Sequence, residues 1–104
     1  MSTPTQRSKK LMESEGYLVA IVEKWNPHAK VRQDLWGLLD LLCVADGKGV
    51  VGVQTTSASN MAARRNKIRA HVNYAAVEGA GIRIELHGWR KVGRHWEVKR
   101  EVIS

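Results

Sequence analysis

The feature that most constrains the fold is a pair of apolar segments joined by a short glycine-rich turn. Residues 38–45 read LLDLLCVA and residues 50–56 read VVGVQTT. The intervening Asp46-Gly47-Lys48-Gly49 is typical of a β-hairpin turn. A nearly continuous apolar run is typical of a central strand that is buried on both faces. The sequence therefore predicts that this hairpin lies in the middle of a sheet.

The rest of the chain divides into segments of helical or strand periodicity. We expect helices over 8–15 and 59–78, and strands over 17–25, over 30–45 (with the buried run in its second half), over 81–91 and over 94–103. The order α-β-β-β-α-β-β predicts an α+β domain: a central mixed sheet of about five strands, one helix before it and a basic helix after the third strand. Residues 1–8 are expected to be a flexible lead-in, and residues 9–104 a single domain.

Composition narrows the class of protein further. Among 104 residues, 43% are hydrophobic, but no apolar run reaches the roughly 18 residues that span a bilayer. The N-terminus lacks the apolar segment of a secretory signal. The single cysteine, Cys43, excludes an internal disulfide framework, which agrees with a cytoplasmic location. No membrane partner is expected.

The chain carries a formal charge of +7, and a small domain this basic most often binds a polyanion. The alternative is a generally basic, solvated surface. We expect contacts to nucleic-acid phosphates from Lys30, Arg32, Arg64, Arg65, Lys67, Arg69, Arg90, Lys91 and Arg94. Trp89 and Trp96 either stack on bases or pack as aromatics of the last hairpin.

Asp40 is the most informative residue, because a carboxylate within a leucine run is costly to bury without compensation. One interpretation is that Asp40 caps a backbone group at the start of a strand. The other depends on register, because side chains alternate along a strand. Asp40 shares a face with Gln54 and Thr56 only if paired residue numbers sum to an even value, as a three- or five-residue loop would give.

In that register a carboxylate, an amide and a hydroxyl would converge on one sheet surface. Such hard oxygen ligands suit Mg²⁺ or Mn²⁺. One carboxylate alone would hold a divalent ion weakly, so a second acid or a substrate phosphate has to complete the ligand set.

The hairpin residues RQDLWGLLDLL and VVGVQTT, with a helix and strand before them and a basic helix after them, resemble the PD-(D/E)xK nuclease superfamily. The Holliday-junction-resolvase-like and small phage-type endonuclease branches are the most similar. Asp40, preceded by Gly37, matches the family aspartate. Gln54 falls on the acid position of the second strand, and Thr56 falls where the family has lysine.

The resemblance implies a restriction-endonuclease-like fold in which Asp40, Gln54 and Thr56 form the catalytic motif and a bound metal activates water. Thr56 cannot supply the positive charge of the family lysine. Arg64 is expected to supply it from the basic helix as an electrostatic clamp, and Lys67 is the second choice. The alternative for both is a solvated basic face that contacts DNA.

A further acid is expected from the first helix, where the resemblance implies Glu13 or Glu15. An ordinary exposed helix acid is the competing interpretation. Glu23 and Asp34 are reserve ligands, although Asp34 is expected to pair with Arg32 instead. The four histidines lack zinc-ligand spacing, and the sequence shows no nucleophile–histidine pair.

These features favour a Mg²⁺- or Mn²⁺-dependent DNA endonuclease that acts on branched or structured duplex DNA as a homodimer. The missing lysine leaves a second hypothesis open: a catalytically inactive copy of the fold that binds DNA as a recombination, repair or phage accessory protein. A third is a basic RNA-binding module in which Asp40 is incidental.

Overall fold

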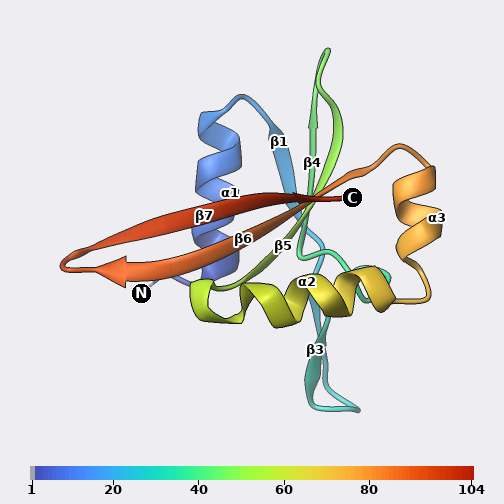
Figure 1. Cartoon of the computed structure of the whole chain (residues 1–104), viewed down its shortest axis with the longest axis horizontal. Coiled ribbons are helices and arrows are strands. Elements are labelled where there is room, and N and C mark those ends of the chain that lie inside the picture. Colours follow the sequence, from blue (N-terminus) through green and yellow to red (C-terminus); the bar gives the residue numbers. More distant parts are fainter. Residues whose placement is uncertain (1) are drawn as a thin grey trace.

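The computed structural model describes residues 2–104, which form eleven elements in a compact arrangement (Figure 1). In chain order these are α1 (Pro4–Ser14), β1 (Leu18–Ile21), β2 (Lys24–Asn26), β3 (Val31–Gln33), β4 (Leu41–Ala45), β5 (Gly49–Ser57), the 3₁₀ turn η1 (Ala58–Asn60), α2 (Met61–Ala70), α3 (Tyr74–Gly79), β6 (Arg83–Val92) and β7 (His95–Ile103).

A five-stranded sheet with the order β1-β4-β5-β6-β7 organises the fold. The β5–β6 pair is parallel and the other pairs are antiparallel. The parallel pair requires a crossover, which η1, α2 and α3 provide. The expected α+β class, with a mixed sheet of about five strands and a central β4–β5 hairpin, is confirmed.

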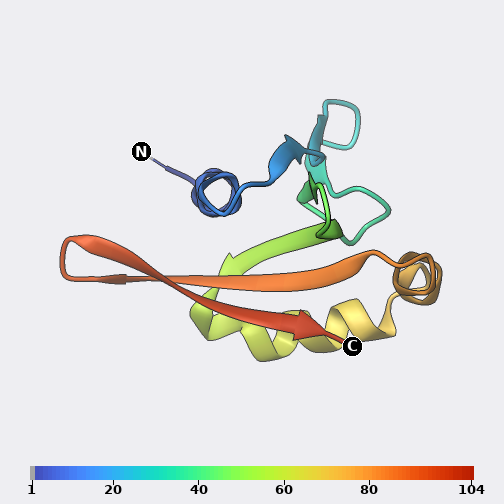
Figure 2. The same ribbon diagram turned by 90° about the horizontal axis from the view of Figure 1, so that it is seen from above.

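Helices cover both faces of the sheet (Figure 2). On one face Met12 of α1 packs with Leu41, Cys43, Val51 and Val53. On the other face α2 and α3 bury Met61, Ile68 and Val77 against Ile84 and Leu86 of β6, and Leu42 of β4 packs against this cluster. The β4 strand is therefore apolar on both faces, as its sequence predicts.

The first helix begins earlier than expected. Thr3 caps it through a capping box with Gln6, and Pro4 occupies the first helical turn. The predicted boundary at residue 8 is therefore wrong, and most of the expected lead-in is helical. This helix has 11 residues, and none of the helices among residues 2–104 combines the length and apolar character that crossing a bilayer requires.

The expected strand 17–25 is two strands in different sheets. β1 lies at the edge of the main sheet, and β2 pairs only with β3 to form a two-stranded arm that projects from the body (Figure 1). The Val22 N–H donates to the carbonyl of Asp40, so the chain leaves the main sheet at that point. The amide oxygen of Asn26 accepts from two backbone N–H groups and stabilises the turn at the tip of the arm.

The expected single helix over 59–78 is also wrong, because it is broken between α2 and α3. His71 takes an extended conformation (ψ 140°) that ends α2. Val72, four residues after the buried Ile68 and on the same face of a continuous helix, is 88% exposed. The break turns the chain so that both Ile68 and Val77 reach the same core.

Candidate functional site

The base of the β2–β3 arm brings two acids together. Lys24 pairs with Gln33 in the antiparallel arm. Glu23 and Asp34 are the next residues towards the base of the arm, just outside β2 and β3. The register of the arm places them opposite each other. The arm thus explains why two carboxylates separated by ten residues of chain meet in space.

A tight loop adds Asp40 to this pair. Leu35 and Leu39 form an isolated antiparallel bridge, which folds the chain back between Asp34 and Asp40. Gly37 permits this turn because its φ is +75°, and because a Cβ there would lie 2.5 Å from Nε2 of His71. One carboxylate oxygen from each of Glu23, Asp34 and Asp40 lies within 4.8 Å of the others.

Asp40 is the buried member of this acidic triad, which we define as Glu23, Asp34 and Asp40. Its Oδ2 accepts hydrogen bonds from the backbone N–H of Thr55 (2.8 Å) and from the Thr55 hydroxyl (3.2 Å). Burial raises the pKa of Asp40, and a hydrogen bond and like charge from Asp34 raise it further. The two hydrogen bonds from Thr55 hold the carboxylate in place. The backbone bond lowers the pKa of Asp40, but by less than burial and Asp34 raise it.

The register of the central hairpin is the even one. Ala45 pairs with Gly49 and Leu41 with Val53, around a three-residue loop. However, the N–H of Asp40 also donates to the carbonyl of Val53 (2.8 Å). Asp40 and Leu41 of one strand therefore both lie opposite Val53 of the other, as in a β-bulge. The carboxylate of Asp40 consequently lies beside Thr55, the residue between the two motif positions.

Gln54 and Thr56 therefore do not share the surface that the acids occupy, contrary to the sequence interpretation. Side chains alternate along β5, and the Thr55 hydroxyl lies 3.3 Å from the hydroxyl of Thr5 in α1. Gln54 and Thr56 accordingly belong to the face that α2 covers, and both are buried. Gln54 donates from Nε2 to the carbonyl of Leu38 (2.6 Å).

One atom of Gln54 is left without a partner. Its Oε1 is buried and accepts no hydrogen bond among the described residues. The bond from Nε2 to Leu38 holds this amide against the chain segment that leads into Asp40. A buried acceptor without a donor costs about 1–3 kcal/mol, so the side chain of Gln54 is less well satisfied than that of Asp40.

The acidic triad has the donor chemistry of a hard divalent cation. Carboxylate oxygens are the preferred ligands of Mg²⁺ and Mn²⁺. In an octahedral Mg²⁺ shell, oxygens on opposite sides lie about 4.2 Å apart. The 4.8 Å limit on the separations in the triad is close to that span, so small side-chain movements suffice for the three acids to share one ion.

The expected metal ligand Glu13 lies elsewhere. It is exposed and pairs with Lys9 across one helical turn (3.0 Å). Glu15, the other helix acid considered, pairs with Arg100. Neither residue belongs to the acidic triad, and the two reserve acids of the sequence interpretation take their place.

Arg32 is the basic residue that the structure pairs with the triad. Its guanidinium lies 3.7 Å from Glu23, not paired with Asp34 as expected. Glu23 and Arg32 also line a groove of about 410 Å³, together with Ile21 and the first residues of α1, Thr3, Pro4, Thr5 and Gln6. Glu23 is therefore open to solvent beside the N-terminus of α1, whereas Asp40 is buried.

The two helix-borne candidates for the missing lysine are neighbours on α2. Arg64 and Lys67 line a small surface hollow of about 190 Å³. Neither is paired with a carboxylate among residues 2–104. Both lie on the helix that covers the Thr56 face, whereas the acids lie beside Thr55. The structure thus assigns neither residue to the acidic triad.

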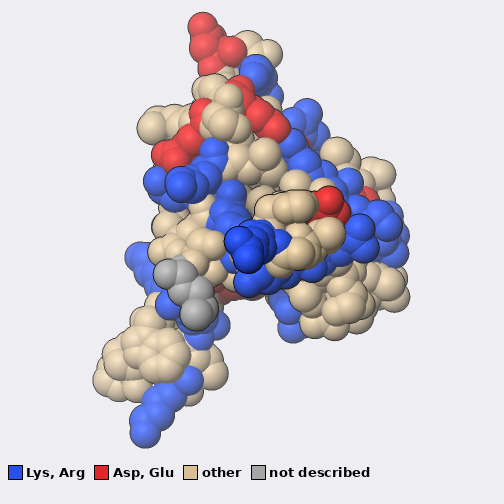
Figure 3. Space-filling view, turned by 90° about the vertical axis from the view of Figure 1, so that its left-hand side faces the viewer, with Lys and Arg blue, Asp and Glu red and all other residues tan. Residues whose placement is uncertain are grey.

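The other predicted phosphate contacts lie on three separate elements. Lys30 and Arg32 are on the arm or its turn, Arg64, Arg65, Lys67 and Arg69 are on α2, and Arg90, Lys91 and Arg94 are on the β6–β7 hairpin. Arg65 is held by Glu101, and Arg90 by Glu97. Figure 3 shows Lys and Arg over the tip of the hairpin and beside it, and a notch between the projecting arm and the rest of the molecule.

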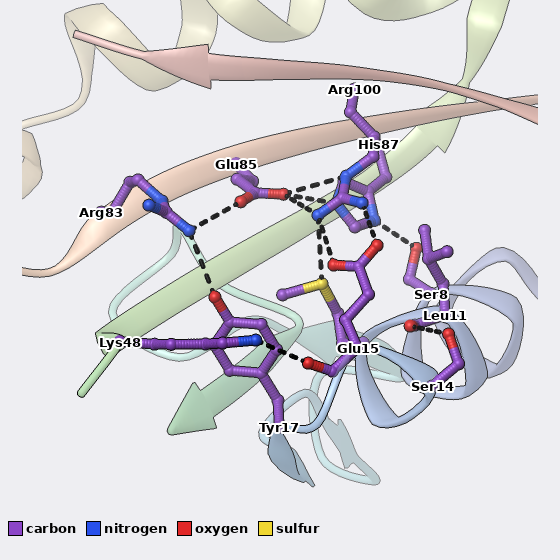
Figure 4. A network of polar contacts seen from close by, with 11 residues as sticks. Ser8, Leu11, Ser14, Glu15, Tyr17, Lys48, Arg83, Glu85, His87 and Arg100 are labelled. Atoms are coloured by element: carbon purple, nitrogen blue, oxygen red, sulfur yellow. Dashed lines mark hydrogen bonds and ion pairs between the residues drawn. The ribbon is translucent and has the colours of Figure 1, made fainter. Parts of the chain in front are cut away.

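A second polar cluster joins α1 to the sheet (Figure 4). Trp89 Nε1 donates to the Ser8 hydroxyl (2.9 Å), which lies 2.8 Å from Nδ1 of His87. His87 Nε2 lies 3.0 Å from a Glu85 carboxylate oxygen, which also accepts from Arg100. Indole N–H is only a donor, so the Ser8 oxygen accepts from Trp89, and the tautomer of His87 sets the direction of its bonds to Ser8 and Glu85.

This order of serine, histidine and carboxylate invites comparison with a hydrolase triad. Ser8 and His87 are both 0% exposed, so no substrate reaches the hydroxyl. The pKa of Glu85 is lowered to about 2 by its hydrogen bond from His87 and by Arg100, despite burial. The cluster therefore acts as a buried clamp between α1 and the sheet.

The chain was compared with family models, curated proteins and solved structures. No match was found in any of the three comparisons. Its function is therefore argued from its own residues.

The sequence contains a signal that favours Glu23 and Asp34 as metal ligands over Glu13. Asn26-Pro27 marks a turn, and a hairpin with a four-residue loop over 27–30 pairs residue 23 with residue 34. The β-bulge at Asp40 left no such signal, because a bulge depends on how the neighbouring strands pack. The clamp left none either, since Ser8 and His87 are 79 residues apart.

Proposed function

We propose that the chain is a metal-dependent DNA endonuclease of the PD-(D/E)xK type, with a restriction-endonuclease-like fold. The observation that carries this proposal is the acidic triad at the start of β4, one member of which is buried with a raised pKa. Groups with strongly perturbed pKa values that share a cleft are concentrated at functional sites. The chain as a whole carries a formal charge of +7, as a protein that binds a polyanion commonly does.

In this proposal Glu23, Asp34 and Asp40 hold the ion, and Thr55 orients Asp40. A bound Mg²⁺ or Mn²⁺ would activate water for attack on a phosphodiester and neutralise charge on the phosphate. Arg32 balances part of the charge of the acids. We keep Arg64 and Lys67 as contacts to DNA phosphates rather than as substitutes for the family lysine.

The proposed substrate is branched or structured DNA, and the proposed active form is a homodimer that presents two sites to two strands. The edge strand β1, which exposes Leu18 (75%) and Ile21 (47%), offers a surface for pairing with a second copy.

The rival function, a catalytically inactive DNA-binding copy of the fold, has one observation in its favour. Thr56 replaces the family lysine and is buried on the opposite face from the acids. An inactive protein would bind DNA without cutting it under any metal.

The deciding experiment is a cleavage assay on four-way junction, flap and linear duplex DNA, with Mg²⁺, with Mn²⁺ and with EDTA. We expect metal-dependent cutting that Asp40→Asn and Asp34→Asn abolish. Glu13→Gln is the matched control, because it removes an acid outside the triad. If the wild-type protein bound DNA without cutting it, the catalytically inactive DNA-binding function would be established instead. Exclusive binding of RNA would contradict both the endonuclease and the DNA-binding function.

A further inference from the structure

The β2–β3 arm, residues 24–33, contributes no residue to either apolar core of the molecule. It pairs only with itself, through three residue pairs, and projects from the main sheet (Figure 1). Apart from the partly buried Asn26, every residue of the arm is exposed. A two-stranded hairpin of this kind is marginally stable in water, so packing does not account for the side chains that it carries.

The charged side chains of the arm are all positive. The arm contains Lys24, Lys30 and Arg32 and no aspartate or glutamate. Figure 3 shows Lys and Arg at the outer end of the arm. The acids that flank it, Glu23 and Asp34, lie at its base in the acidic triad. A basic ribbon that starts from a cluster of acids suits a polyanion that lies along the arm and reaches an ion at its base.

One face of the arm carries an exposed indole beside a guanidinium. Trp25 pairs with Arg32, so the two side chains are neighbours on the same face. Trp25 is 57% exposed, and the side chain of Arg32 is 65% exposed. In the part of the chain that the structure describes, no cation covers the ring of Trp25, whereas Arg7 covers that of Trp96. An accessible aromatic ring next to a cation is the arrangement on which unpaired bases stack.

The same face leads to the acidic triad. Because side chains alternate along a strand, Glu23 lies on the face of Trp25. The ion pair between Glu23 and Arg32 agrees with this placement. Two residues at about 3.3 Å each place Trp25 about 7 Å from Glu23 along the arm. Glu23 and Arg32 also line the groove of about 410 Å³ beside α1, so a DNA strand in this groove reaches the acids and the indole together.

We propose that the β2–β3 arm binds an unpaired nucleotide of the DNA substrate, with its base stacked on Trp25 and its phosphate near Arg32. The bases of a linear duplex are stacked on one another, so this contact requires a branch, a flap or a gap. The inference rests on the proposed nuclease function for the identity of the polyanion, and it names the feature of the substrate that the arm recognises. Trp25 is in this way a specificity-determining residue whose contact needs no metal ion.

The test is binding of labelled DNA in EDTA, where no cutting occurs. The variant is Trp25→Ala, and the matched control is Val31→Ala, which removes an exposed apolar side chain from the opposite face of the arm. We expect Trp25→Ala to bind flap DNA at least about fivefold more weakly than the wild type, because stacking of one base on an aromatic side chain contributes about 5- to 140-fold in affinity. Its affinity for a linear duplex should change by less than about twofold, because a duplex offers no free base.

Two further results complete this comparison. Val31→Ala should bind both DNAs as the wild type does. Trp25→Phe should keep most of the affinity for flap DNA, because it keeps an aromatic ring. Equal losses on flap and duplex for Trp25→Ala, or no loss on the flap, would overturn the proposal.

The fluorescence of 2-aminopurine reports the stacking directly. This base analogue replaces the unpaired base at the branch point of the flap. We expect the wild-type protein to quench its fluorescence and saturating Trp25→Ala to leave it unquenched. Equal quenching by the two proteins at saturation would contradict a contact with Trp25.

The two proposals fail separately. If no metal supports cutting but Trp25→Ala still loses affinity for flap DNA, the nuclease function is wrong and the arm remains a binding site for unpaired nucleotides. If Asp40→Asn abolishes cutting while Trp25→Ala binds flap DNA as the wild type does, the nuclease function stands and the arm contact is excluded.

Other occupants of the arm would give different results. If Trp25→Ala converted a dimer to monomers in sedimentation and left the affinity for flap DNA unchanged, a second copy of the chain would cover the arm and the proposal would be wrong. Tighter binding of single-stranded RNA than of flap DNA, with the same loss in Trp25→Ala, would overturn DNA as the ligand.

Discussion

Gly37 shows how one residue without a side chain positions two acids. Its φ of +75° is disfavoured for residues with a Cβ. A Cβ at this position would also lie only 2.5 Å from Nε2 of His71. The carbonyl of the neighbouring Trp36 accepts from Asn73, which also fixes this loop to the α2–α3 connection. The positions of Asp34 and Asp40 therefore depend on a contact with a helix break that lies more than 30 residues away.

We predict that Gly37→Ala lowers the free energy of unfolding by about 2–4 kcal/mol, from backbone strain plus the clash with His71. Gly47→Ala is the matched control, because Gly47 also has a positive φ (77°) but an open surrounding. The control should lose only about 1–2 kcal/mol. Urea unfolding measures both, and equal losses would refute a role for the His71 contact.

Replacing Asp40 is predicted to raise the free energy of unfolding of the metal-free protein, whereas Gly37→Ala lowers it. Its raised pKa means that the folded protein binds a proton that the unfolded chain releases, so the stability from this group is lost as pH rises. Without metal, Asp40→Asn should therefore stabilise the protein at pH 8 by about 1–3 kcal/mol, by removing charge from a crowded site.

The gain from Asp40→Asn should shrink as pH falls towards 4 and vanish below the unfolded pKa of aspartate, about 3.9, where the acid is protonated in both states. Thermal unfolding in EDTA measures this, with the exposed Asp46→Asn as the control. Saturating Mn²⁺ should stabilise the wild-type protein more than Asp40→Asn. A destabilised Asp40→Asn at pH 8 in EDTA would contradict the crowding of charge.

At the scale of elements, α1 is attached to the sheet by polar bonds as well as by apolar packing. The Ser8 hydroxyl accepts from Trp89 and is hydrogen-bonded to Nδ1 of His87, and all three residues are buried. One hydroxyl therefore satisfies two groups that water cannot reach.

We predict that Ser8→Ala costs about 2–4 kcal/mol, because it leaves two buried polar groups without partners at about 1–3 kcal/mol each. Ser14→Ala, on the same helix, removes only an exposed bond to the carbonyl of Leu11 and should cost less than about 0.5 kcal/mol. Hydrogen exchange of α1 amides, read alongside urea unfolding, distinguishes local detachment of the helix from global loss of stability. Similar values for the two variants would show that the clamp contributes little.

The elements predicted correctly are those whose signals are local. The β4–β5 and β6–β7 hairpins are specified by apolar periodicity on both sides of a glycine turn. The end of α2 was not predicted, because Val72 follows Ile68 at helical spacing and no glycine or proline marks the extended backbone at His71. Of the acidic triad, Asp40 was identified from its leucine neighbours. Glu23 and Asp34 were named only as reserve ligands, because their approach to Asp40 depends on how the β2–β3 arm folds.

At the scale of the whole molecule, two sets of carboxylates act on stability in opposite directions. Burial and crowding raise the pKa of Asp40, whereas hydrogen bonds lower the pKa values of Glu85, Glu15 and Glu101. Stability from the lowered acids is present above their unfolded pKa, near 4.3, and is lost as pH falls towards 2. Stability associated with Asp40 is lost as pH rises above about 4.

We predict that the metal-free protein is most stable in mildly acidic solution, at about pH 5. Glu85→Gln should flatten the acid limb of the stability profile, and Asp40→Asn should flatten the limb above the maximum. Urea unfolding from pH 3 to pH 9 in EDTA measures the profile. A maximum above pH 7 that Asp40→Asn does not move would contradict the prediction.

The clamp has a consequence for the order in which the chain acquires its structure during synthesis. The partners of α1 at Trp89 and Arg100 are made 81 and 88 residues after Ser8 and Met12. At about 5–20 residues per second, a ribosome needs about 5–20 s to produce them. An isolated helix of this length is only marginally stable. Helix α1 can therefore pack its apolar side on β4 and β5 before its polar partners in β6 and β7 have been made, and it is fully secured only when β7 emerges.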